Sequence, residues 1–269
     1  MMLLLSAPYM HRAALFLLCV ALTGAVLSVV VNLRGMEFSV EALVHSVFPG
    51  IVVGLAVAGL PGILPGAALA ALLTVLVLAR LDTRADHEAG TAVVLTLMYG
   101  IGVLISLKVG DRSGQLEALM FGRLLDVTAT RIAPSLALCA VAALLILATW
   151  RAQLAVAFDR EAARVTGLRV NWVDLGANIA VGIFVVAASS AIGVLLVLGF
   201  VVIPGLVGRL LARSAETMAA WALLSALAAV AAGLWLMLSF HQVSPQAAVV
   251  LVLALSVPLA LVGRRAWVS

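Results

Sequence analysis

Nine long apolar runs, separated by short polar segments, account for most of this sequence. They lie near residues 11–32, 38–58, 62–80, 90–107, 130–150, 172–192, 194–211, 217–239 and 246–262. A helix needs about 20 apolar residues to cross the hydrocarbon core of a bilayer. The runs lack the alternation of a barrel strand, so their backbone groups can be satisfied in lipid only within helices. The sequence therefore predicts an all-α, polytopic membrane protein with about eight or nine transmembrane helices.

The composition indicates that lipid covers most of the protein surface. Charged residues make up 10% of the chain and hydrophobic residues 65%, whereas soluble domains carry about 25% charged residues. This balance excludes a soluble enzyme and a disordered protein. The net charge is +4, but the basic residues are scattered between apolar runs, which excludes nucleic-acid binding. Since no linker or repeat divides the chain, we expect a single transmembrane domain over residues 1–269.

Sequence signatures of catalysis are missing from the chain. Its only lysine is Lys108, and it has no Gly-x-x-x-x-Gly-Lys-Ser/Thr stretch that would hold the phosphates of ATP. No nucleophile–base pair and no cofactor motif stands out. We therefore expect a protein that is not an enzyme and that carries no covalently bound cofactor.

The arginines indicate which loops face the cytoplasm. Five segments hold most of them, namely Arg34, Arg80 with Arg84, residues 151–169, Arg209 with Arg213, and Arg264 with Arg265. With nine spans and the N-terminus outside, all five segments lie on the cytoplasmic side, as the positive-inside rule requires. We therefore predict an external N-terminus and a cytoplasmic C-terminus. Region 193–212 is the weakest of the spans, because it also fits a re-entrant helix.

Two ionisable side chains, Glu41 and His45, lie within the run 38–58. A charge at the centre of a bilayer costs at least about 2.5–3.5 kcal/mol, so such residues usually face a protein interior and serve a function. The spacing i, i+4 places both side chains on one face of a helix. A carboxylate and an imidazole supply half of a divalent-metal site, and a two-fold related copy would supply the rest. The alternative is a hydrogen-bonded pair near the interface.

Two Pro-Gly pairs interrupt apolar runs. Pro49 cannot donate a backbone hydrogen bond, so we expect a kink that frees the His45 carbonyl, next to Gly50. Pro204 and Gly205 interrupt the run 194–211, and interrupted segments of this kind form gates or binding regions in transporters. Tight helix packing through glycine is the alternative for the second pair.

The longest charged segment, 151–171, has apolar residues at helical spacing. Phe158, Ala162, Val165 and Leu168 alternate with charged residues, which predicts an amphipathic helix that ends near Gly167. One interpretation is a docking helix for a soluble partner. The other is a solvated connector that lies on the membrane surface.

Four segments resemble, in order, those of one transporter family. They are NLRGMEFSVEALVHSVFPG, MFGRLLDVT, AFDREAARVTGLRV and GVLLVLGFVVIPGLVGRLLARS, and the resemblance extends from about Tyr9 to Arg265. Each is similar to a segment of the ABC-3 family permeases, which transport zinc, manganese or iron. The resemblance implies a type II ABC importer permease in the bacterial inner (plasma) membrane, working with a cytosolic ABC ATPase and an extracytoplasmic metal-binding protein, as a homodimer or with a paralogous permease.

The resemblance also assigns roles to residues. His45 matches the family's membrane-embedded histidine, Glu41 the aspartate four residues before it, and Pro49-Gly50 the Pro-Gly that follows. The transported divalent metal would pass between Glu41 and His45 of two copies. The segment matching the ATPase-docking region contains Phe158, Asp159, Glu161, Ala162, Arg164, Gly167 and Leu168.

The chain departs from the family pattern at the metal segment. Val40-Glu41 replaces the usual Gly-Asp, which lengthens the carboxylate side chain and leaves the identity of the metal open. The alternatives are a permease for a chelated metal or a cobalamin-type ligand, and an ATP-independent channel or secondary transporter.

Overall fold

The computed structural model of the protein describes residues 8–81, 87–109, 122, 129–240 and 243–268. Within these ranges every regular element is a helix, and nine helices are long and apolar enough to cross a membrane. The predicted all-α, polytopic fold is therefore confirmed. The long helices are α2 (Pro8–Arg34), α3 (Glu37–Ala58), α4 (Ile63–Leu81), α5 (His87–Val109), α7 (Ala129–Phe158), α9 (Val170–Ile192), α10 (Val194–Leu211), α11 (Ala215–Ser239) and α12 (Pro245–Val268). A 3-10 turn, η1 (Leu60–Gly62), precedes α4, and a short helix, α8 (Arg160–Val165), follows α7.

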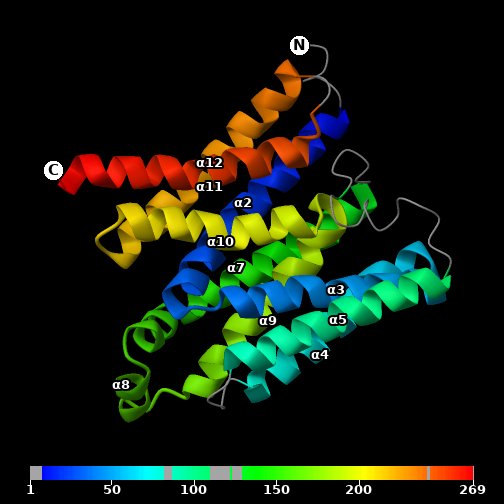
Figure 1. The fold of residues 1–269 in the computed structure, drawn as a ribbon, viewed down its shortest axis with the longest axis horizontal. Helices are drawn as coiled ribbons and strands as arrows, with labels where there is room; N and C mark the ends of the chain where they lie inside the picture. The colour runs from blue at the N-terminus through cyan, green and yellow to red at the C-terminus, as the bar shows by residue number, and fades with distance from the viewer. Residues whose placement is uncertain (1–7, 82–86, 110–121, 123–128, 241–242, 269) are drawn as a thin grey trace.

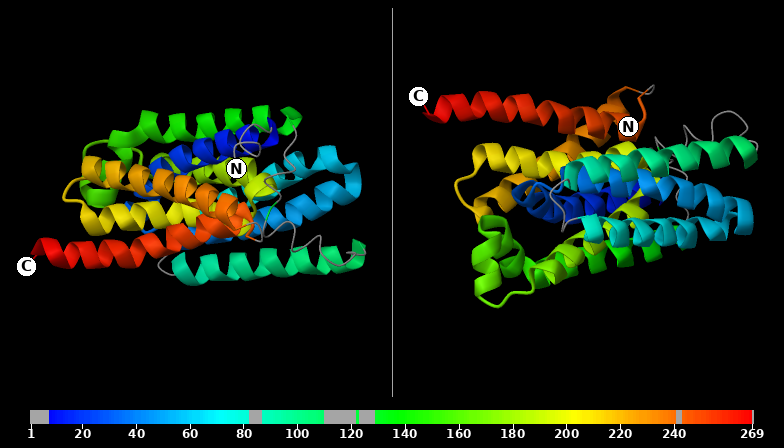
Figure 2. Two further views of the ribbon diagram at one scale, coloured as in Figure 1. Left: turned by 90° about the horizontal axis from the view of Figure 1, so that it is seen from above. Right: turned by 60° about the horizontal axis from the view of Figure 1, so that its bottom comes forward.

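The long helices run between two ends of the molecule and pack around α2, α9 and α10 (Figures 1 and 2). The aromatic side chains Phe16, Phe184 and Phe200, one from each of these helices, are fully buried, and Phe184 and Phe200 both lie against Gly24 of α2. The beginning of α2 and the end of α12 lie toward opposite ends, as an odd number of spans requires.

The outer surfaces of the peripheral helices are apolar. Large aliphatic side chains are exposed on α4, α5, α7 and α12, namely Leu69, Leu72, Leu73, Leu97, Leu104, Leu107, Leu144, Leu147, Leu255 and Leu259. A soluble protein does not expose apolar bands of this extent. These surfaces are therefore suited to lipid, as the composition predicted.

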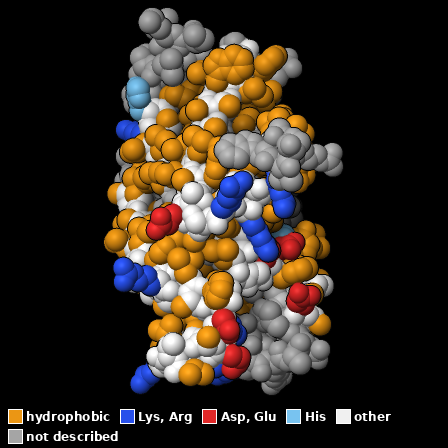
Figure 3. All heavy atoms as spheres, turned by 90° about the vertical axis from the view of Figure 1, so that its left-hand side faces the viewer, with side chains coloured by type: hydrophobic (Ala, Val, Ile, Leu, Met, Phe, Trp, Pro, Cys, Tyr) orange, Lys and Arg blue, Asp and Glu red, His pale blue; other side chains and the backbone are white. Residues whose placement is uncertain are grey.

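The basic helix ends share one end of the molecule. The ends of α2, α4, α10 and α12, which carry Arg34, Arg80, Arg209 and Arg264, lie toward the same end as α8 (Figure 1). Figure 3 views this end directly and shows acidic and basic side chains dispersed across it. Arg84 and residues 110–121 and 123–128, which include most of the segment MFGRLLDVT, lie outside the described residues.

The prediction of one amphipathic helix over 151–171 is wrong in its boundaries. Helix α7 continues to Phe158, and the chain is extended at Asp159, where φ is −152°. The Asp159 carboxylate accepts hydrogen bonds from the backbone N–H groups of Glu161 and Ala162, at 3.0 and 2.9 Å, and so begins a new helix. That helix, α8, ends at Val165, and Gly167 has a φ of +87°, close to the predicted end.

Region 193–212 forms α10, an 18-residue helix that meets the length and hydropathy of a span. At 1.5 Å per residue it is about 27 Å long, close to the thickness of the hydrocarbon core. Gly193, with a φ of +81°, lets the chain reverse between α9 and α10. Gly122 packs against this reversal, since a Cβ there would lie less than 3.0 Å from the Ile192 and Gly193 backbone.

Candidate functional site

Glu41 and His45 mark the open face of α3. Between residues 39 and 52 of this helix, Glu41 and His45 are partly exposed and every other residue is buried. They lie one helical turn apart, so the two polar side chains occupy one strip along the helix. The prediction that they share a face is confirmed. In a membrane this strip requires a polar or protein neighbour rather than lipid.

An aromatic residue that the sequence analysis missed, Tyr99 of α5, lies beside His45. The two rings meet edge to face, with centroids 5.6 Å apart and planes at 83°. The centroid of the Tyr99 ring also lies 6.2 Å from that of the Phe48 ring, and Tyr99 is 41% exposed. The only signal in the sequence is an isolated tyrosine within the apolar run 90–107, which does not reveal a partner on another helix.

Glu41 and His45 cannot complete a metal site within one described chain. Among the residues that the structure describes, no group of three or more His, Cys, Asp or Glu side chains could hold a metal ion. Zinc in proteins usually takes four ligands, and a transit site can also use water. The chain can therefore offer two side chains to an ion, and the remaining ligands must come from elsewhere.

Two sides of α3 are fixed by close contacts with α4 and α5. A Cβ at Gly50 would lie less than 3.0 Å from the Gly66 carbonyl of α4. On the other side, a Cβ at Gly102 of α5 would lie less than 3.0 Å from the Phe48 ring, with Pro49 next to it. Helix α3 continues through Pro49 as one element. The Pro49-Gly50 pair thus lies where α3 is tightly packed.

The Pro204-Gly205 pair of α10 lies against α2. A Cβ at Gly205 would lie less than 3.0 Å from the Ser28 carbonyl and the Asn32 amide. The buried Asn32 side chain donates hydrogen bonds of 2.9 Å to the carbonyls of Ser28 and Val202. The tight packing weighed for this pair is therefore present. Asn32 was missed because an asparagine near the end of an apolar run carries no distinctive pattern.

Replacing Asn32 with alanine is expected to weaken the contact between α2 and α10. The variant loses two buried hydrogen bonds, each worth about 1 kcal/mol, so the free energy of unfolding should fall by about 2 kcal/mol. Thermal unfolding of the purified protein in detergent measures this change. The matched control is Asn171→Ala, because the Asn171 side chain is exposed. An equal effect of both substitutions would contradict the role of Asn32.

The predicted docking segment projects from the basic end of the molecule. Besides its Asp159 cap, α8 carries an ion pair between Arg164 and Glu161, 2.6 Å long and exposed to solvent. Phe158 is 95% exposed and Val165 is 88% exposed, and Ala162 is exposed as well. Leu168 is instead partly buried against a small cluster of Val156, Ala163 and Val170. The segment thus presents apolar and charged side chains together.

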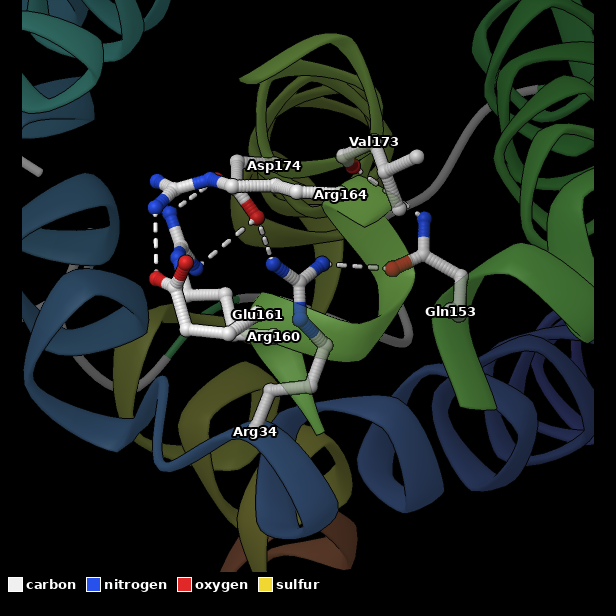
Figure 4. Close-up of polar contacts among 7 residues, drawn as sticks. All are labelled: Arg34, Gln153, Arg160, Glu161, Arg164, Val173 and Asp174. Carbon is white, nitrogen blue, oxygen red and sulfur yellow. Dashed lines mark hydrogen bonds and ion pairs between the residues drawn. The ribbon is translucent and has the colours of Figure 1, made fainter. Parts of the chain in front are cut away.

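A buried polar cluster attaches α8 to the bundle (Figure 4). At its centre is Asp174 of α9, which forms ion pairs with Arg34 of α2 and Arg160 of α8. Asp174 was not among the predicted site residues. Its position inside the predicted span 172–192 was the available signal, since an acid within an apolar run needs a partner.

Comparison with known proteins agrees with this arrangement. The sequence model of the ABC 3 transport family matches residues 6–263. The chain belongs to the ABC 3 transport family. The family resemblance predicted from the four segments is thus confirmed, and the protein is a multi-pass membrane protein of a transporter family.

Curated relatives cover most of the chain. The chelated iron transport system membrane protein YfeD of Yersinia pestis is 26% identical over 87% of this chain and 78% of its own length. The manganese transport system membrane protein MntB of Synechocystis is 25% identical over 96% of this chain and 84% of its own length. YfeC, a second chelated iron transport system membrane protein of Yersinia pestis, is 27% identical over 76% of this chain and 69% of its own length.

Solved structures share the fold. The PsaBC complex from Streptococcus pneumoniae with a Fab contains a chain that superimposes with a TM-score of 0.82, at 21% identity, covering 96% of this chain and 92% of that one. A transporter described as metal-chelate type, in an inward-facing conformation, gives a TM-score of 0.67 at 16% identity, over 91% of this chain and 82% of that one. The predicted ABC importer permease fold is confirmed.

Proposed function

We propose that this chain is the permease subunit of an ABC importer for a divalent metal ion, zinc, manganese or iron. Glu41 and His45 of two permease copies coordinate the ion in transit, and the ion is cargo rather than a resident cofactor. Alternating access moves it across the bilayer. The chain does not hydrolyse ATP, and a separate ATPase supplies the energy.

The observation that carries the proposal is the open strip of α3. An acid and a histidine are the two residues that this helix leaves uncovered between positions 39 and 52. A second copy facing the strip would remove both from lipid and bring the number of side-chain ligands to four, a number that suits zinc. The names of YfeD and MntB, which specify iron and manganese transport, support a metal as the cargo.

The α8 segment supports a cytosolic partner. Its exposed Phe158 and Val165 would be covered by a groove on an ABC ATPase, with Glu161 and Arg164 at the rim. The basic helix ends next to it favour the cytoplasm at this end, with the N-terminus outside and the C-terminus inside. The membrane would be the bacterial inner membrane, and an extracytoplasmic protein would deliver the metal.

The second permease copy is either this same chain or a paralogue. The two Yersinia pestis relatives, YfeC and YfeD, share one system name, which supports pairing of paralogous permeases in that organism. In either case the two-fold arrangement brings two copies of α3 together. Pro49-Gly50 and Pro204-Gly205 would then act as points where tightly packed helices shift during gating.

The decisive experiment is metal uptake by the double variant Glu41→Gln, His45→Ala. Uptake of radioactive manganese, zinc and iron should fall at least about tenfold, because even hydrogen-bond partners of metal ligands contribute 10–100-fold. Each metal is supplied both as the free ion and as a chelate, which separates an ion importer from a chelate importer. The amount of permease in the membrane is measured in parallel.

The control for this experiment is the pair Glu37→Gln and His11→Ala, which removes one acid and one histidine elsewhere in α3 and α2. The control should retain wild-type uptake. Wild-type uptake by the Glu41, His45 double variant would rule out the coordination model. If the wild-type protein takes up only the chelate and not the free ion, the chain is a chelate importer.

A further inference from the structure

The cluster around Asp174 joins four helices through one carboxylate. Arg160 of α8 donates to both Asp174 oxygens, at 2.5 Å to Oδ2 and 3.4 Å to Oδ1. Arg34, the last residue of α2, donates to Asp174 Oδ1 and, from its other terminal nitrogen, to Gln153 Oε1 of α7 at 2.5 Å. Gln153 in turn donates to the Val173 carbonyl at 3.2 Å. Figure 4 shows these side chains converging from α2, α7, α8 and α9.

The side chains of this cluster range from a buried inner pair to a partly exposed outer arginine. The side chains of Asp174 and Arg34 are 6% and 5% exposed, whereas that of Arg160 is 37% exposed. The inner pair is thus shielded from water and held in one geometry, which strengthens its electrostatic attraction. The outer contact joins this fixed core to the projecting helix α8.

Helix α8 has few other attachments to the bundle. It is six residues long, too short to be stable by itself, and Ala163 is its only buried residue. The apolar cluster that receives Ala163 contains Val156 and Val170, with Leu168 and Val173 beside it. The ion pair between Arg160 and Asp174 is therefore the main polar connection between α8 and the bundle.

Arg34, at the inner end of the cluster, is close in sequence to the strip of Glu41 and His45. Arg34 ends α2, and Gly35 and Met36 alone separate it from α3. The Met36 N–H donates to the Val31 carbonyl at 3.0 Å, which ties this joint back to α2. Glu41 lies seven residues beyond Arg34 on the helix that the joint begins. A displacement of Arg34 is therefore passed to α3 over a short distance.

We infer that Asp174 is a positioning residue that couples movement of α8 to α3 through Arg160 and Arg34. This inference rests on the proposed function, since it assumes that a motor protein acts on α8. A force on α8 pulls on Asp174 through Arg160, and the fixed pair of Asp174 and Arg34 transfers it to the α2–α3 joint. The strip of Glu41 and His45 then changes its exposure with the position of α8.

The experiment uses the permease assembled with its cytosolic ATPase in proteoliposomes. The variant is Arg160→Gln, which breaks the link at its solvent-exposed end and leaves the buried pair of Arg34 and Asp174 in place. Assembly, ATP hydrolysis and metal transport are measured on the same sample. We expect unchanged assembly, ATP hydrolysis within about twofold of wild type, and at least about fivefold less metal moved per ATP, the lower end of typical coupling between sites.

Two further variants complete the test. Arg151→Gln removes an exposed arginine of α7 that lies outside the cluster, and it should leave the metal-to-ATP ratio unchanged. Arg160→Lys retains one charged donor for Asp174 and should recover part of the ratio. The ratio separates coupling from a merely structural role, because a misplaced α8 would lower assembly, hydrolysis and transport together.

The outcomes distinguish the inference from the function on which it rests. Loss of ATPase binding with an unchanged metal-to-ATP ratio would show that Asp174 only holds α8 in place, which overturns the inference. Full activity of Arg160→Gln would overturn it as well. A wild-type complex that moves no metal, or moves it without ATP, would instead refute the proposed function and the inference with it.

Discussion

Replacing Gly54 with valine is expected to prevent α3 and α4 from packing and to leave little folded protein. A Cβ at Gly54 would lie less than 3.0 Å from the carbonyl of Gly62, and a Cβ at Gly62 would lie equally close to the carbonyl of Gly54. The atoms in the way belong to the backbone, so no side-chain rotation can make room. Overpacking of this kind costs about 3 kcal/mol or more.

Thermal unfolding of the purified protein in detergent, together with its amount in the membrane, measures this effect. The matched control is Gly100→Val on α5, where a Cβ would meet no atom within 4 Å. The control should unfold close to the wild-type temperature. If both variants unfold at that temperature, the close approach of α3 and α4 is incorrect.

The same contact determines where the candidate site points. Gly50 and Gly54 of α3 face Gly62 and Gly66 of η1 and α4, an arrangement that resembles the small-xxx-small pairs of transmembrane helices. Helix α5 packs at Phe48 and Pro49, one turn after His45 and on the same side of α3, and its Tyr99 contacts the His45 ring. The contact of Gly50 and Gly54 with α4 lies on the side of α3 away from Glu41 and His45, so this glycine contact determines the direction in which the metal ligands are presented.

The nine spans could be predicted from the sequence because each depends on a local property. A run of apolar residues is long enough to span or it is not, and charged residues interrupt it. For example, the predicted run 90–107 lies inside α5, and the run 217–239 inside α11. The i, i+4 spacing of Glu41 and His45 is likewise a local property, which is why their common face was predictable.

Contacts between distant residues could not be predicted in the same way. Asp174 and Arg34 lie 140 positions apart, and Asn32 and Val202 lie 170 apart. Neither pair leaves a periodic pattern in the sequence, because the polar residues involved, Asn32, Arg34 and Asp174, each stand alone near the end of an apolar run. The end of α7 was missed because the apolar pattern stops at Trp150, whereas the helix continues to the Asp159 cap.

Among the charged side chains that the structure describes, Asp174 is the one whose replacement with alanine should lower stability most. The variant removes the Asp174 carboxylate from the Arg34 side chain, which is 5% exposed and still donates to Gln153. Removing one partner of a buried ion pair typically costs about 3–5 kcal/mol, because the remaining charge loses that counter-charge while it stays shielded from water. Arg160 can turn to solvent, so most of the loss arises at Arg34.

Unfolding of the purified permease in detergent measures this loss, and two comparisons identify its cause. Glu161→Ala removes an exposed ion pair from α8 and should change stability by less than about 1 kcal/mol. The double variant Arg34→Met, Asp174→Leu removes both buried charges and should regain most of the stability, because an apolar pair of similar size carries no desolvation cost. If the double variant is as unstable as Asp174→Ala, the loss comes from packing rather than from breaking the buried ion pair.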